Sequence, residues 1–269
     1  CKELNLFPDG KTAYKIEMDE LRDWNGDLAE DWNDIELGLR EGMIKTTPLE
    51  GDLHYCAGDF RSEELIDLLK QSDVVVTNPP FSVFREFVAK LIEYDKKFII
   101  LGNKNALTYK EIFPLIMHNK LWTGFTRWAG GMWFISDHED YYDEIRDGVL
   151  MKNVASIWYT NIEVAKFREF IPLWAKYSPE KNPRYDNYDA IEVSKTAEIP
   201  EDYFGVMGVP ITFLDKYNPN QFEILGATES EGVGFSNGLW HDDSKFKQAT
   251  INGKKVYKRL FIRRREVRQ

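Results

Sequence analysis

The ten residues 73–82 read DVVVTNPPFS. The β-branched run Val74–Val76 is typical of a strand in a parallel sheet that is buried on both faces. The segment Asn78–Pro80 then ends the strand, because proline has no amide hydrogen for the ladder. Ser82 is a favourable N-cap. The stretch therefore predicts a strand, a tight loop and a helix in succession.

The flanking segments continue this alternation of strands and helices. The helix expected after Ser82 has apolar residues at a spacing close to 3.6, at positions 84, 87, 88, 91 and 92. Residues 98–101 (FIIL) read as a second buried strand, and residues 54–57 (HYCA) as a short earlier one. The alternation predicts an α/β fold with a doubly wound, mostly parallel sheet.

Helix-start signals lie on both sides of this core. Ser62 is expected to cap a helix whose apolar face is formed by residues 65, 66, 68 and 69. Thr108 and Glu111 match a capping box for a helix over residues 112–116. Pro114 lies inside that segment and is expected to kink or divide it.

We expect two domains in the 269 residues. Residues 1–160 would form the catalytic domain, with later strands at 131–135 and 155–160. Residues 161–269 would form a smaller C-terminal lobe. Residues 5–52 are polar and read as loops or an irregular insertion, apart from one strand within residues 11–18.

Composition limits the function classes. Hydrophobic residues make up 43% and charged residues 30% of the chain, which is typical of a folded globular protein. No apolar run reaches the roughly 20 residues of a membrane helix, and no signal peptide is evident. Cys1 and Cys56 are expected to be reduced thiols of a cytoplasmic protein. The four histidines are scattered, so no metal site is predicted.

The net charge of −10 argues against a nucleic-acid partner, but the basic residues are unevenly distributed. Eight of them lie in the last sixteen residues, at Lys254, Lys255, Lys258, Arg259, Arg263, Arg264, Arg265 and Arg268. Such a basic end can bind phosphates. The alternative is a solvated terminal strand whose Leu260 and Ile262 face inward.

The loop after the central strand carries the chemistry. Ligands of open α/β sheets bind beyond the carboxyl ends of the strands. The Asn78 side-chain oxygen and the Pro79 carbonyl are two acceptors that can hold an aromatic amine, while the prolines restrict the loop. Phe81 offers a face for a base to stack on. The alternative is a plain turn with Phe81 in the core.

At this point the chain resembles the EcoRI-type adenine-specific DNA methyltransferases, which share an NPPF signature after a hydrophobic strand. The resemblance runs from about residue 54 to the end. It is carried by the stretches GDFRS at 58–62, TNPPFS at 77–82, LIEYDKKF at 91–98, YKEIFPLI at 109–116, YDNYDAI at 185–191 and GVMGVPITFL at 205–214.

The resemblance implies an S-adenosylmethionine-dependent, Rossmann-like enzyme that methylates the N6 amine of a flipped-out adenine in double-stranded DNA. It would be a monomer of the restriction–modification type, acting in the cytoplasm and encoded by a bacterium or phage. The implied roles are as follows: Asn78, Pro79, Pro80 and Phe81 catalytic; Asp59, Phe60 and Asn78 at the cofactor; Lys258, Arg259, Arg263, Arg264 and Arg265 at the DNA.

One departure from the family's pattern leaves alternatives open. No glycine-rich turn after a buried strand precedes residue 54, and the chain begins at Cys1 rather than at methionine. We therefore expect the first cofactor-binding element to be missing. A protein glutamine or an RNA amine is an alternative substrate, and a non-catalytic DNA-binding remnant is an alternative to an enzyme.

Overall fold

The computed structural model describes residues 13–125, 130–228 and 248–265. The chain forms two compact units, Cys1–Ser72 and Asp73–Gln269, and each is described by itself. The expected division after residue 160 falls inside the second unit. No helix in the described ranges combines the length and the apolar character needed to cross a membrane.

The first unit contains a helix that the sequence did not predict. Strands β1 (Tyr14–Ile16) and β2 (Thr46–Pro48) pair antiparallel, and helix α1 (Trp32–Arg40) lies between them in the chain. Two side chains cap the start of α1. The Asp31 carboxylate accepts a hydrogen bond from the amide of Asn33 at 2.8 Å, and the Asp34 carboxylate accepts one from the amide of Asp31 at 3.0 Å. The strand predicted within residues 11–18 is confirmed as β1, whereas the prediction of loops or an irregular insertion for the rest missed α1, whose start is marked by these caps.

The strand expected at residues 54–57 is also absent from the structure. Only Cys56 pairs there, in a single bridge with Gly51. The Asp52 carboxylate accepts from the amides of His54 and Tyr55, at 2.7 and 2.8 Å, and so turns the backbone back. The capping prediction for α2 (Glu63–Gln71) is confirmed, because the Ser62 hydroxyl accepts from the amide of Leu65 at 3.3 Å.

The expectation for the cysteines is corrected at one of the two positions. Cys56 is disulfide-bonded rather than a reduced thiol, and Cys1 lies outside the described residues. Pairing depends on how close two Cα atoms come in the fold, which the cysteine count cannot show.

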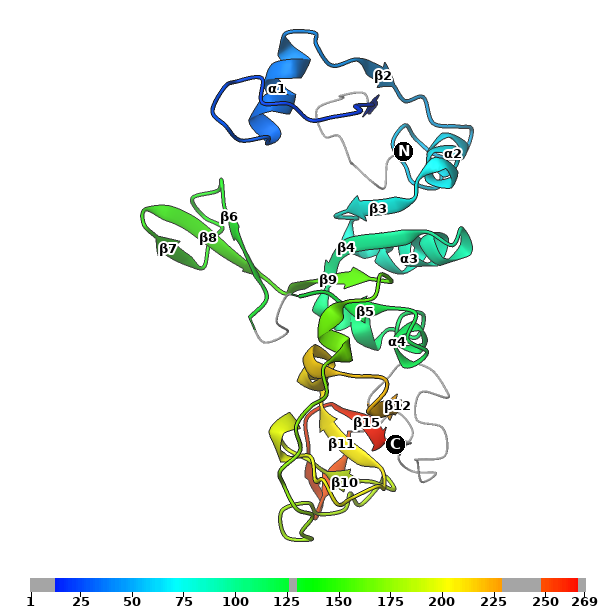
Figure 1. Ribbon diagram of the computed structural model, residues 1–269, viewed down its shortest axis with the longest axis vertical. Coiled ribbons are helices and arrows are strands. Elements are labelled where there is room, and N and C mark those ends of the chain that lie inside the picture. Colours follow the sequence, from blue (N-terminus) through cyan, green and yellow to red (C-terminus); the bar gives the residue numbers. More distant parts are fainter. Residues whose placement is uncertain (1–12, 126–129, 229–247, 266–269) are drawn as a thin grey trace. The chain divides into compact units, whose positions relative to one another are not determined.

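The second unit has a four-stranded sheet in the order β3-β4-β9-β5 (Figure 1). Strand β3 pairs parallel with β4, whereas β9 runs antiparallel to both β4 and β5. Three strands therefore share one direction. The four strands are β3 (Val74–Thr77), β4 (Lys97–Asn103), β5 (Trp122–Thr123) and β9 (Ser156–Thr160).

Strand β3 lies at the edge of this sheet, not in its centre. The side chains of Val74 and Val76 are 44% and 66% exposed, and Ile99 beside them is 37% exposed. The prediction that this strand is buried on both faces is therefore wrong for the described residues. The other face is covered, because Phe98 and Ile100 of β4 are fully buried.

The two α-helices of this unit start without the side-chain caps that the sequence predicted. Residues Phe81–Val83 form a 3₁₀ turn, so α3 (Phe84–Glu93) starts two residues after Ser82 and without a side-chain cap. Helix α4 (Phe113–Met117) likewise lacks the predicted capping box, and Pro114 sits in its first turn instead of kinking it. A 3₁₀ helix, η2 (Lys104–Thr108), takes up the residues before it.

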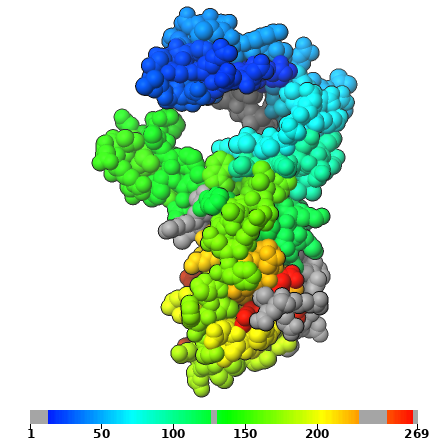
Figure 2. Space-filling model, in the orientation of Figure 1, coloured from blue at the N-terminus to red at the C-terminus, as the bar shows by residue number. Residues whose placement is uncertain are grey.

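A separate antiparallel sheet leaves the main sheet between β5 and β9. Its order is β6-β8-β7, and it stands out as an arm in both views (Figures 1 and 2). The strands are β6 (Met132–Ile135), β7 (Glu144–Arg146) and β8 (Val149–Val154). The strands predicted at 131–135 and 155–160 are thus confirmed as β6 and β9, although they belong to different sheets.

A second four-stranded sheet, in the order β10-β11-β15-β12, forms the C-terminal part of the unit. Leu260, Phe261 and Ile262 of β15 are fully buried. The elements are β10 (Ile191–Glu192), β11 (Met207–Pro210), β12 (Phe222–Ala227), β15 (Arg259–Arg264), the hairpin β13 (Thr250–Ile251) and β14 (Lys254–Lys255), and the short 3₁₀ helices η3 (Ala165–Arg168), η4 (Thr196–Glu198) and η5 (Ile211–Lys216).

A buried ion pair joins β10 to β15 in this sheet. Arg259 Nη2 lies 2.7 Å from Glu192 Oε1, and the two side chains are 11% and 6% exposed. The Tyr185 hydroxyl donates to Glu192 Oε2, and burial followed by the nearby Glu192 charge raises the pKa of Tyr185. Ser194 donates to the same carboxylate at 3.1 Å. The Glu192 carboxylate therefore accepts hydrogen bonds from the side chains of Arg259, Tyr185 and Ser194.

Replacing Glu192 by alanine should destabilise the protein by about 3–5 kcal/mol, because the Arg259 charge would remain buried without its counter-ion. Urea unfolding followed by circular dichroism measures the change. Glu198→Ala is the matched control, since the Glu198 pair with Lys195 is exposed and should contribute less than about 1 kcal/mol. Equal stability of the two variants would contradict this role.

Candidate active site

The NPPF loop leaves the sheet at the carboxyl end of β3. Pro79 is buried, whereas Asn78 and Pro80 are exposed and Phe81 is 37% exposed. The amide of Val83 donates to the Pro80 carbonyl at 3.1 Å, which closes the turn. The structure therefore keeps the four predicted residues together at the edge of the sheet where ligands bind in α/β proteins.

Both predicted acceptors of this loop are available to a ligand. The Asn78 side chain makes no hydrogen bond to any residue that the structure describes, and no described amide donates to the Pro79 carbonyl. Such free acceptors at a loop held by two prolines are pre-positioned for a donor such as an amine. Phe81 is too exposed for a core residue and presents part of its ring to solvent.

The helix that follows the loop is anchored by a close contact with the sheet. The Phe84 side chain is 1% exposed, and its ring centroid lies 5.0 Å from that of Tyr159. A Cβ atom at Gly102 would come within 2.3 Å of Phe84 Cε2, so only glycine lets α3 approach β4 this closely. The sequence analysis missed this anchor, although a glycine inside an apolar strand signals a close approach.

The carboxyl end of β4 is fixed in the same region. The Tyr159 hydroxyl donates to the Asn103 carbonyl at 2.8 Å, and burial raises the pKa of Tyr159. The Asn103 side chain accepts from the amide of Asn105 at 2.8 Å and begins η2. The polar groups of this strand end are thus used for structure, which leaves Asn78 as the free amide side chain of the neighbouring loop.

At the end of β5, the same edge exposes an aromatic ring. Phe125 is 74% exposed, and Lys166 Nζ lies 5.9 Å from the centre of its ring. Lys166 also donates to the Gly124 carbonyl, and burial lowers the pKa of this lysine. The carboxyl ends of β3 and β5 therefore present the Asn78 amide and the rings of Phe81 and Phe125. Lys166 is instead used within the fold, where it holds the Gly124 carbonyl.

The residues predicted to contact a cofactor lie in the first unit. Asp59 is 7% exposed, and Arg61 engages both of its oxygens, at 2.9 Å from Nε and 2.7 Å from Nη2. The guanidinium lies over the rings of Tyr55 and Phe60, at 4.7 and 5.5 Å. The Arg61 hydrogen bonds hold the pKa of the Asp59 carboxyl below its usual value, against the opposing effect of burial.

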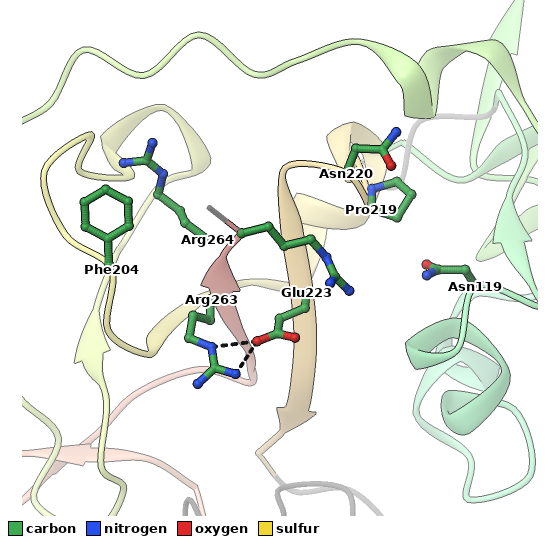
Figure 3. Close-up of a pocket in the computed structure, with 8 residues that line it drawn as sticks. Asn119, Phe204, Pro219, Asn220, Glu223, Arg263 and Arg264 are labelled. Atoms are coloured by element: carbon green, nitrogen blue, oxygen red, sulfur yellow. Dashed lines mark hydrogen bonds and ion pairs between the residues drawn. The ribbon is translucent and has the colours of Figure 1, made fainter. Parts of the chain in front are cut away.

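The five residues predicted to contact DNA do not lie together: Arg259 is buried, whereas the arginines at positions 263–265 line a hollow. Arg259 is 9% exposed and serves Glu192, so we remove it from the set of surface contacts. Lys258 is partly buried and has an interaction partner. The remaining arginines, at positions 263–265, line a hollow of about 810 Å³ together with Asn119, Phe204, Pro219, Asn220 and Glu223 (Figure 3).

Internal contacts set the positions of these arginines. Arg263 Nε donates to Glu223 at 2.6 Å, and Arg264 lies over the Phe204 ring at 4.7 Å, as Figure 3 shows. Arg264 Nε is buried without a partner in the described part of the chain, and Arg265 Nε donates to the Phe222 carbonyl at 3.3 Å. Three guanidinium groups thus surround the hollow against one carboxylate, which suits an anion.

The model of the adenine-specific methyltransferase EcoRI family matches residues 3–265. The chain belongs to this family. The resemblance drawn from the NPPF stretch and its neighbours is thereby confirmed.

Three bacterial type II methyltransferases of the family are similar to the chain. M.EcoRI of Escherichia coli is 46% identical over 221 residues, which are 79% of this chain and 64% of M.EcoRI. M.MpnI of Mycoplasma pneumoniae is 36% identical over 87% of this chain and 76% of its own length. M.MgeORF184P of Mycoplasma genitalium is 36% identical over 83% and 73%. The chain thus spans less than two thirds of M.EcoRI. No solved structure matches it.

The Asp59–Arg61 pair predicts a pH-dependent contribution to stability. Since folding lowers the pKa of Asp59 below 3.8, the contribution is complete above that pH and is lost as the pH falls through the lowered value. Arg61→Gln should therefore cost about 2 kcal/mol at pH 7. The difference from the unaltered protein should shrink in acid.

Urea unfolding at a series of pH values from 7 to 3 measures this difference. Arg22→Gln is the control, because the ion pair of Arg22 with Glu20 is exposed and should contribute little at any pH. A stability difference for Arg61→Gln that stays constant down to pH 3 would show that the carboxylate charge is not involved.

Proposed function

We propose that the chain is the catalytic part of an S-adenosylmethionine-dependent methyltransferase that acts on the N6 amine of adenine in double-stranded DNA, in a restriction–modification system. The observation that carries the proposal is the pair of free acceptors, Asn78 Oδ1 and the Pro79 carbonyl, beside the half-exposed Phe81. Membership of the EcoRI family supports the reaction. The bacterial relatives support action in the cytoplasm of a bacterium.

The loop residues have separate tasks in this reaction. The amine of adenine is conjugated to its ring, so its lone pair is a poor nucleophile. The Asn78 side-chain oxygen and the Pro79 carbonyl accept hydrogen bonds from the two N–H groups of the amine and stabilise the positive charge that develops on nitrogen in the transition state. Pro80 closes the turn through its carbonyl, and Phe81 stacks on the base.

The adenine must leave the duplex to reach this loop. Its amine is paired and stacked inside DNA, so the base is flipped out before it contacts Asn78. The hollow lined by the arginines at 263–265 suits a phosphate of the backbone, since guanidinium groups bind phosphate in a bidentate manner. These contacts offset the net charge of −10 locally.

S-adenosylmethionine would supply the electrophilic methyl group. The described residues fit this cofactor only in part: the Asp59 carboxylate suits a ring amine but is shared with Arg61, and Phe60 adds an aromatic face. The role of Asn78 and Pro79 in the step itself is to orient the amine by accepting hydrogen bonds from its two N–H groups.

We also propose the finer architecture, a doubly wound sheet. Strands β3, β4 and β5 share one direction, and α3 connects the first two, as expected for such a fold. The exposed Val74 and Val76 support a wider sheet, because an apolar edge strand of this kind accepts a further strand by backbone pairing.

Replacing Asn78 by alanine should reduce turnover at least about a hundredfold, because one transition-state acceptor is lost, with little change in DNA affinity. N6-methyladenine formed in mixed-sequence DNA is measured by mass spectrometry with S-adenosylmethionine present. Asn105→Ala, at another exposed asparagine of the unit, is the control and should keep its activity.

Undiminished turnover of Asn78→Ala would refute the assignment of the loop. Methyl transfer from the unaltered protein to protein or RNA alone would instead support the alternative substrates. Absence of both methyl transfer and cofactor binding in equilibrium dialysis would favour a non-catalytic role.

A further inference from the structure

The hairpin β13–β14 presents a group of charged and aromatic side chains that the reaction does not use. Lys254 and Lys255 are exposed and have no ion-pair partner among the described residues. Tyr257, directly after the hairpin, is 86% exposed and stacks on no described ring. Basic groups beside a bare aromatic ring are the combination that binds nucleic acids.

The hairpin holds these side chains on a rigid base. Its turn is Asn252-Gly253, and both residues have positive φ, at 50° and 73°, which is the geometry of a tight hairpin turn. The Asp186 carboxylate accepts from both turn amides, at 3.1 and 2.8 Å. The amide of Thr250 donates to the Asn187 side chain at 3.0 Å. The lysines are therefore displayed by an ordered turn.

One face of the hairpin is buried against the C-terminal core. Ile251 and Val256 pack against a cluster that includes Tyr185, Tyr188 and Phe261. Because side chains alternate along an extended chain, the burial of Val256 directs Tyr257 outward. Arg259 Nη1 also donates to the Tyr257 carbonyl at 3.2 Å, which ties the tyrosine backbone to the buried Glu192 pair.

The charge balance favours an anionic partner. Lys254 and Lys255 are adjacent in the hairpin, and the Asp186 carboxylate accepts hydrogen bonds from the backbone amides of its turn, at Asn252 and Gly253. By contrast, Arg259 and Arg263 are neutralised by Glu192 and Glu223. In a chain of net charge −10, Lys254 and Lys255 are cations that no described carboxylate pairs with.

We infer that the β13–β14 hairpin is a DNA contact in which Lys254 and Lys255 bind backbone phosphates and Tyr257 stacks on a base or sugar. The inference rests on the proposed function, because DNA is the substrate proposed there. It adds a contact separate from the arginine-lined hollow. The two lie at opposite ends of β15, and the four strand residues 259–262 separate them by about 13 Å, or roughly four base pairs of one duplex.

The test uses fluorescence anisotropy with a labelled mixed-sequence duplex at several salt concentrations. The double variant Lys254→Gln/Lys255→Gln should make the negative slope of log K against log salt shallower by about 2, since each lost phosphate contact contributes about −0.9 to that slope. Lys97→Gln/Lys181→Gln removes the same charge from two other exposed positions and should leave the slope unchanged.

The tyrosine is tested in the same assay. Tyr257→Ala should weaken binding about tenfold or more, whereas Tyr257→Phe should bind like the unaltered protein, because the ring face and not the hydroxyl makes the contact. Trp174→Ala is the control for loss of a bare aromatic side chain, since Trp174 is 81% exposed. Thermal unfolding confirms that each variant is folded.

The outcomes separate this inference from the proposed function. If the unaltered protein binds DNA and methylates adenine while the hairpin variants match their controls, the hairpin inference is overturned and the proposed function stands. If the unaltered protein neither binds nor methylates DNA, both are overturned. A loss of salt slope and of affinity in the hairpin variants alone supports the inference.

Discussion

The contact between Phe84 and the bare Cα of Gly102 is the constraint on which the site depends. It brings the start of α3 onto β4 so closely that no Cβ fits between them. Tyr159 packs on the same ring and donates to the carboxyl end of β4. The NPPF loop thus connects the edge strand β3 to a helix, α3, that is anchored on the sheet. Its acceptors are held in place before any ligand arrives, which saves the entropy of ordering them.

The C-terminal part of the chain shows how a basic segment divides its charges. One strand, β15, uses Arg259 internally to satisfy Glu192, directs Arg263 to the surface and leaves Arg264 partly buried beside the hollow. The burial of Arg259 is acceptable because its partner carboxylate also receives hydrogen bonds from Tyr185 and Ser194. A count of arginines therefore overstates the positive charge that a ligand can reach. Lys254 and Lys255, which are exposed and precede the strand, add to that accessible charge.

The arm β6-β8-β7 has a different character from these basic surfaces. Ile135, Tyr141 and Ile145 are more than half exposed, and its ion pair between Lys152 and Asp143 stays within the arm. It is inserted at the end of the sheet that carries the loops, between β5 and β9. Its apolar side chains and acidic residues distinguish it from the arginine-lined hollow.

The sequence by itself determined the loop, the family and the alternation of helices and strands from α2 to β4. Residues 73–82 fixed a strand, a proline turn and a helix, because β-branched runs and prolines act over a few residues. Ser62 capped its helix as predicted. The caps expected from Ser82, Thr108 and Glu111 were not used, since short 3₁₀ turns took their places.

Only the tertiary structure decided which groups remain free. The sequence could not show that β3 lies at an edge, that Arg259 is buried or that Arg61 occupies the Asp59 carboxylate. These outcomes depend on side chains brought together from distant segments, such as Glu192 and Arg259, 67 residues apart. Local pattern predicts residue types and elements. The pairing of their charges is set by packing, which no short window of sequence contains.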